Sequence, residues 1–76
     1  MEQFERIIHD VGIMGGKPCI AGTRITVGMI LMQISDGTTP QELLVEYPHL
    51  TAEDIQAALR YAAWAVGTKE EILVSA

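Results

Sequence analysis

The chain has 76 residues, a net charge of −5 and a hydrophobic content of 49%. One domain of this length buries only about 60% of its unfolded surface, so the high apolar content favours a homodimer or a permanent partner. The acidic balance argues against strong nonspecific nucleic-acid binding, because neutralising phosphates requires clustered Lys and Arg.

A single cysteine, Cys19, excludes an internal disulfide. Its apolar context predicts a small buried side chain rather than a catalytic thiol partnered by His9 or His49. His9 has no second ligand at metal spacing, so we expect no metal, no cofactor and no enzymatic activity. The apolar stretches are far shorter than the ~20 residues of a membrane span, and no signal peptide is recognisable. We therefore expect a cytoplasmic protein.

The N-terminal arm, residues 1–11, carries apolar residues with charges between them. The spacing of Phe4, Ile7, Ile8 and Val11 suits one face of a helix. The β-branched pair Ile7-Ile8 before a glycine equally suits a short strand. With a turn-rich segment following, we favour a strand over residues 6–9.

A glycine-rich segment, residues 15–25, cannot be the interior of a helix. Cys19-Ile20 and Ile25–Val27 have the length of two short strands around an Ala21-Gly22 turn, in which Gly22 supplies the positive φ. Gly16-Lys17 resembles part of a P-loop, but the glycine spacing is wrong and Pro18 follows the lysine. Turn-forming glycine is therefore the better interpretation.

The first helix is expected over residues 27–35, with Thr26 as its N-cap and Asp36-Gly37 as its stop. Nearly every position is apolar, so we expect the core on one side and a partner chain on the other. Met29 and Met32 suit either gap-filling in the core or an adaptable binding surface. Gap-filling is the commoner use and is our prediction.

The segment Thr39-Pro40-Gln41-Glu42 predicts the start of a second helix, because it combines an N-cap, a proline at the first helical position and a capping box. Leu43, Leu44 and Tyr47 follow at helical spacing, and Pro48 closes the helix after about two turns.

The third helix begins with the same device, because Thr51 is an N-cap and Asp54 stands three residues later. Leu50 can pack against Ile55 as a hydrophobic staple, and Gly67 is a natural residue just past the helix end. One apolar face is predicted from Ile55, Ala58, Leu59, Ala62 and Val66. Residues 68–76 are expected to form a short strand or a tail that becomes ordered on a partner.

Three successive helices with a tight link at Pro48–Leu50 are typical of a helix-turn-helix. In that geometry the third helix reads DNA, with Gln56 suited to adenine and Arg60 to guanine or phosphate. Glu53 and Asp54 would repel the phosphates, and the alternative is that both simply complement the helix dipole. The pattern is therefore a stronger statement about fold than about DNA binding.

Two motifs resemble the bacterial domain-of-unknown-function family 433. They are Gly15-Gly16-Lys17-Pro18-Cys19-Ile20-Ala21-Gly22-Thr23-Arg24-Ile25-Thr26-Val27 and Tyr47-Pro48-His49-Leu50-Thr51-Ala52-Glu53-Asp54-Ile55-Gln56-Ala57-Ala58-Leu59-Arg60-Tyr61-Ala62-Ala63. With the segment 36–42 between them, the resemblance runs from about residue 7 to residue 63. It implies a mainly α fold, a three-helix homeodomain-like helix-turn-helix bundle preceded by short β-strands. The expected organisation is a single domain, with a β-arm and hairpin at 1–26, the three helices at 27–67 and a tail at 68–76.

The resemblance also implies the antitoxin of a type II toxin–antitoxin pair, whose toxin resembles a PIN-type, metal-dependent ribonuclease. An acidic chain can cover the basic rim of such a nuclease, and the segment Glu70, Glu71, Ile72 and Leu73 is our candidate contact. A dimer could place two third helices in successive major grooves, with Lys17 and Arg24 contacting phosphates. The alternatives are a stand-alone transcriptional regulator and a dimeric interaction module that does not bind DNA.

Overall fold

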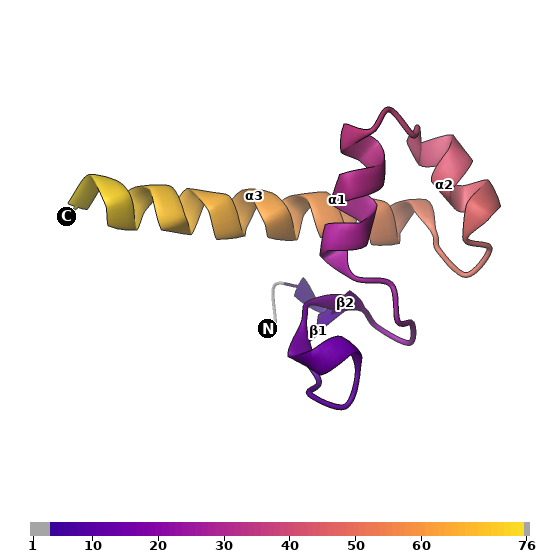
Figure 1. Cartoon of the computed structure of the whole chain (residues 1–76), viewed down its shortest axis with the longest axis horizontal. Coiled ribbons are helices and arrows are strands. Elements are labelled where there is room, and N and C mark those ends of the chain that lie inside the picture. The colour runs from indigo at the N-terminus through magenta and orange to yellow at the C-terminus, as the bar shows by residue number, and fades with distance from the viewer. Residues whose placement is uncertain (1–3, 76) are drawn as a thin grey trace.

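The computed structural model describes the backbone of residues 4–75 and the side chains of residues 4–70. Its elements, in chain order, are β1 (Ile7–Ile8), a 3₁₀ turn (Met14–Gly16), β2 (Cys19–Ile20), α1 (Val27–Ser35), α2 (Pro40–Glu46) and α3 (Ala52–Ser75). The predicted mainly α fold with a short N-terminal β-hairpin is confirmed. The hairpin and α1 lie on α3, and α2 packs against the start of α3 (Figure 1).

The two strands pair antiparallel, with Ile7 opposite Ile20 and Ile8 opposite Cys19. The strand predicted over residues 6–9 is confirmed at Ile7–Ile8, and the positive φ predicted for Gly22 is confirmed at 78°. The second predicted strand, Ile25–Val27, is wrong: only an isolated bridge joins Thr26 to Cys19. The reason is that Thr26 caps α1 and Val27 is already helical, so the chain leaves the ladder after one pair.

Helix α1 begins and ends as predicted. The Thr26 side chain accepts a hydrogen bond from the Met29 N–H at 3.0 Å, and Asp36 is the C-cap. Gly37 follows with φ 97°, a conformation that favours glycine. The prediction that Met29 and Met32 fill gaps in the core is wrong, because 39% and 63% of their surfaces are exposed. The core side of α1 is formed instead by residues such as Ile30, which is 1% exposed.

Helix α2 confirms the predicted capping box. The Glu42 N–H donates to the Thr39 hydroxyl, and the Thr39 N–H donates to the Glu42 carboxylate, both at 3.1 Å. The donated hydrogen bonds, first from the backbone and then from the side chain of Thr39, lower the pKa of Glu42 from its ordinary value of 4.5. Pro40 occupies the first turn, and Leu43 anchors the helix in the core with no exposed surface.

One hydrophobic core joins the hairpin to all three helices. Its buried members are Ile7, Ile20, Val27, Ile30, Leu43, Leu50, Ile55 and Ala58. Each strand and each α-helix therefore contributes at least one side chain, and α3 is held between the hairpin, α1 and α2. At about 25 cal/mol for each Å² of apolar surface removed from water, this shared burial is the main force that assembles the fold.

Helix α3 is longer than predicted. It runs without interruption through Gly67 to Ser75, so both the predicted stop and the predicted strand or tail over residues 68–76 are wrong for residues 68–75. A glycine inside a helix costs only about 1 kcal/mol relative to alanine, and the flanking sequence is rich in good helix formers. The C-terminal half of α3 extends away from α1, α2 and the hairpin (Figure 1).

The predicted apolar face of α3 is confirmed only where a neighbouring element covers it. Ile55 and Ala58 are buried and Ala62 is half-buried. Leu59 is 36% exposed and Val66 is 57% exposed, so their assignment to the core is wrong. Val66 lies on the projecting half of α3, and Leu59 lies at the edge of the packed face.

Candidate functional site: the two halves of α3

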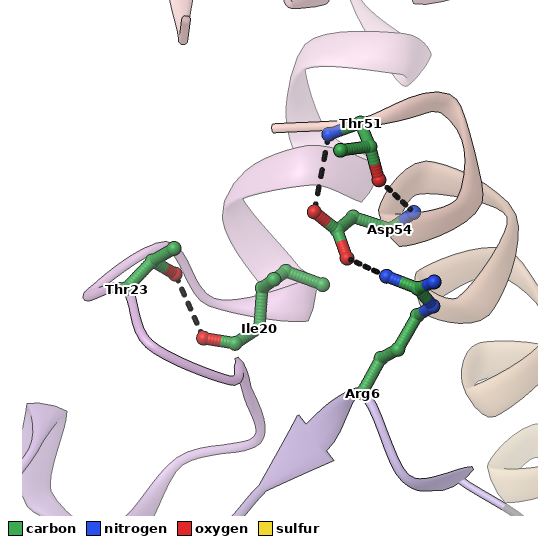
Figure 2. A network of polar contacts seen from close by, with 5 residues as sticks. All are labelled: Arg6, Ile20, Thr23, Thr51 and Asp54. Atoms are coloured by element: carbon green, nitrogen blue, oxygen red, sulfur yellow. Dashed lines mark hydrogen bonds and ion pairs between the residues drawn. The ribbon is translucent and has the colours of Figure 1, made fainter. Parts of the chain in front are cut away.

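The start of α3 is fastened by a polar network that centres on Asp54 (Figure 2). Its carboxylate accepts a hydrogen bond from the Thr51 N–H at 3.1 Å, and the Thr51 hydroxyl accepts one from the Asp54 N–H at 3.1 Å. The other carboxylate oxygen accepts from the Arg6 guanidinium at 3.0 Å. The capping box predicted for α3 is therefore confirmed, and it also ties the helix to the N-terminal arm.

This network changes the interpretation of the acidic residues at the start of α3. The sequence predicted that Asp54 would repel phosphates. Asp54 is only 7% exposed and is paired with Arg6, so it does not present a free negative charge at the surface. Glu53 is exposed in the first turn, where a carboxylate complements the helix dipole. One of the two charges that argued against DNA is thus compensated within the fold.

The predicted reading residues share one exposed face of α3. Gln56 and Arg60 are exposed and stand four residues apart, one turn along the helix, with Glu53 one turn earlier. The helix is continuous beneath them. The arrangement can present an amide and a guanidinium to the edges of bases in a groove.

Lys17 and Arg24 lie elsewhere. Both are exposed, Lys17 beside the N-terminus of α1 and Arg24 in the loop between β2 and α1. Within the described residues, no hydrogen bond or ion pair joins either of them to α3. Gln56 and Arg60 thus share one helix, whereas Lys17 and Arg24 belong to the segments before α1.

The predicted partner-binding segment falls on the projecting half of α3. Glu70 is exposed, and the backbone of Glu71, Ile72 and Leu73 is helical. The side chains of these last three lie outside the described residues. Trp64 and Val66, which the partner prediction did not include, are 42% and 57% exposed on the same half of the helix. Val66 was missed because its spacing placed it on the predicted apolar face of the third helix, and nothing in the sequence showed that the neighbouring elements end before residue 66.

An aromatic group supports α3 where it leaves the core. The ring of Tyr61 lies 5.4 Å from Phe4, edge to face, and 5.8 Å from Trp64, measured between centroids. The Tyr61 hydroxyl is 3.0 Å from Nε2 of His9. His9 is thus a surface hydrogen-bonding residue beside α3, while Cys19 is 1% exposed, as expected for a small buried side chain.

Among the described residues, no group of three or more His, Cys, Asp or Glu side chains is placed to hold a metal ion. In the same part of the chain, no helix combines the length and the apolar character that crossing a bilayer requires.

Besides the exposed Trp64 and Val66, the sequence did not predict a groove on the outer side of α1. It has a volume of about 650 Å³ and is lined by Pro18, Met29, Met32, Tyr47 and Lys17, among others. The sequence did contain a signal for it, since Met29 and Met32 stand three residues apart on one helix face. That spacing alone does not distinguish a core face from an exposed one.

The geometry first defines a class: a mainly α domain in which a two-stranded hairpin precedes three helices, with the connectivity of a helix-turn-helix. A family model described as "Protein of unknown function (DUF433)" matches residues 7–62. The chain belongs to this family, which confirms the resemblance found in its two motifs.

A solved relative supports the same assignment. The crystal structure of a DUF433 member protein from Anabaena variabilis superimposes with a TM-score of 0.78 at 31% sequence identity, covering 96% of this chain and 73% of that chain. None of the curated proteins compared with the chain matches it.

Proposed function

We propose that this protein is the antitoxin of a type II toxin–antitoxin pair and neutralises a PIN-like ribonuclease by binding it through the projecting half of α3. The observation that carries the proposal is the exposure of Trp64 and Val66 on a helix that extends beyond the core. Apolar side chains on a projecting helix suit insertion into a groove of a partner protein. The proposed place of action is the cytoplasm, and the proposal includes no catalytic step.

Charge supports this choice of partner. The chain carries a net charge of −5, and a nuclease that attracts RNA phosphates needs a basic surface around its active site. Opposite charges accelerate the encounter of the two proteins. Apolar contacts along α3 then hold the complex.

Co-expression of the tagged protein with the product of the adjacent gene tests the proposal. We expect stable co-purification and rescue of growth when the neighbour alone is toxic. Val66→Asp, which places a charge on the projecting half, should abolish both. Val45→Asp is the matched control, because Val45 is 82% exposed on α2 and is not part of the projecting half of α3. A non-toxic neighbour would reject the function, and full rescue by the Val66 variant would reject the projecting half of α3 as the contact surface.

We further propose that the Gln56–Arg60 face of α3 binds the operator, so that the protein represses its own operon as a homodimer. The support is the joint exposure of these two side chains one turn apart and the internal pairing of Asp54 with Arg6. Arg24 would add a phosphate contact outside this face.

Binding to the DNA upstream of its own gene, measured at two salt concentrations, tests this part. Arg60→Ala should weaken binding, and Arg60→Lys should retain the salt dependence while losing discrimination between sequences, since lysine lacks the planar fork. Unchanged affinity of Arg60→Ala would remove this face from the DNA interface. Specific DNA binding without a toxic neighbour would indicate a stand-alone regulator, and the absence of both would indicate an interaction module.

A further inference from the structure

The groove on α1 is lined mainly by apolar side chains, with the charged Lys17 at one end. Met29, Met32, Pro18 and Tyr47 line it, and α1 contains no charged residue from Val27 to Ser35. Methionine side chains are flexible and suit a surface that repacks against a partner. Their exposure, 39% and 63%, leaves this face of α1 uncovered by the hairpin and α3.

Two charges of opposite sign mark the ends of this face. Lys17 lines the groove at the N-terminal end of α1, where the Val27 N–H donates to the Pro18 carbonyl at 2.9 Å. Asp36 caps the C-terminal end and follows Met29 by seven residues and Met32 by four, so it lies on the same face. Both side chains are exposed, and within the described residues neither forms an ion pair.

From this arrangement we infer that the groove binds the same groove of a second copy of this chain, with the two α1 helices antiparallel about a two-fold axis. In such an isologous contact both chains use the same surface, so every contact between two residues occurs twice, once in each direction. Met29 and Met32 pack against the partner's pair, and Lys17 of each chain faces Asp36 of the other at both ends. The antiparallel helix dipoles also oppose each other favourably.

Charge favours a second copy over other partners of this groove. Two chains of net charge −5 repel each other over most of their surfaces. The α1 face avoids this repulsion, because its charges are one lysine and one aspartate at opposite ends. The charges on the α1 face are therefore complementary to those of the same face on a second copy. A groove that binds an acidic or a basic peptide would instead carry charges of one sign.

Sedimentation velocity of the full-length protein over a range of concentrations tests the inference. We expect a monomer–dimer equilibrium that Met32→Glu weakens by about tenfold or more, since the two-fold axis would bury the new charge twice. Val45→Glu is the matched control, because it adds the same charge to an exposed apolar site that does not line the groove, and it should leave the equilibrium unchanged. Circular dichroism checks that each variant is folded.

A charge swap tests the antiparallel pairing itself. Lys17→Glu and Asp36→Lys should each weaken the dimer by about tenfold, and the double variant should restore it to near the wild-type value. A monomer at all concentrations, an unaffected Met32→Glu variant, or a double variant no stronger than the single ones would overturn the inference. It extends the proposed homodimer, but its failure is distinguishable from that of the antitoxin proposal, which is measured by co-purification through α3.

Discussion

The carboxylate of Asp54 both caps the start of α3 and holds Arg6 of the N-terminal arm. Replacing it by alanine removes both acceptor oxygens, one serving the Thr51 N–H and the other the Arg6 guanidinium. Because the position is only 7% exposed, water cannot freely replace the lost acceptor. The helix start and the arm should therefore be destabilised together.

The size of the effect follows from the two contacts. Loss of a charged acceptor for the Thr51 N–H at the helix start costs about 1.5 kcal/mol. The pair with Arg6 adds roughly 0.5–1 kcal/mol, because half of the Arg6 side chain is exposed and solvent screens it. We expect Asp54→Ala to lower the free energy of unfolding by roughly 2–2.5 kcal/mol. For a domain of this size the unfolding midpoint should fall by roughly 10–20 °C.

Thermal and urea unfolding followed by circular dichroism measure this loss. Glu53→Ala is the matched control, since Glu53 is the exposed acidic neighbour in the same turn, and it should change the stability by less than about 0.5 kcal/mol. A double-mutant cycle with Arg6→Gln should give a coupling energy of roughly 0.5–1 kcal/mol. Equal effects of the Asp54 and Glu53 variants would refute the role given to the buried carboxylate.

Three further predictions concern the start of α2, the end of α1 and a glycine inside α3. Since folding lowers the pKa of Glu42, its stabilising contribution is present above the unfolded pKa and is lost as the pH falls through the folded value. The stability difference between wild type and Glu42→Gln should thus be larger at neutral pH than in acid, and a pH-independent difference would contradict this. Gly37→Ala should destabilise by roughly 1–2 kcal/mol in urea unfolding, because φ is 97° there. Gly67→Ala should stabilise by up to about 1 kcal/mol, because Gly67 lies inside α3 and a Cβ there would meet nothing within 4 Å; a loss of stability would mean that the helix ends at this glycine.

Local signals in the sequence predicted the helix starts well. Thr26, Thr39 and Thr51 each cap a helix as expected, because the hydrogen bonds of a cap join residues no more than three apart. The same locality explains the failure at Gly67. A glycine is compatible with either a helix end or a helix interior, and the choice depends on the residues that follow.

Contacts between distant residues could not be predicted in the same way. The pair Arg6–Asp54 spans 48 positions, and the pairing of β2 with β1 joins residues 11 to 13 positions apart. For the candidate site, the exposed Gln56 and Arg60 could be predicted from helical spacing. The exposure of Met32 and Val66 could not, because it depends on where neighbouring elements end rather than on the pattern of the helix itself.

The continuity of α3 fixes the relation between the two surfaces that it carries. A helix of 24 residues is about 36 Å long and turns by about 100° per residue, so Arg60 and Glu70 have a set separation and a set rotation about the axis. A protein bound to the C-terminal half of α3 would be held in one orientation relative to a ligand bound at the Gln56–Arg60 face. Deleting or inserting a single residue between them would rotate one surface away from the other while leaving both chemically intact.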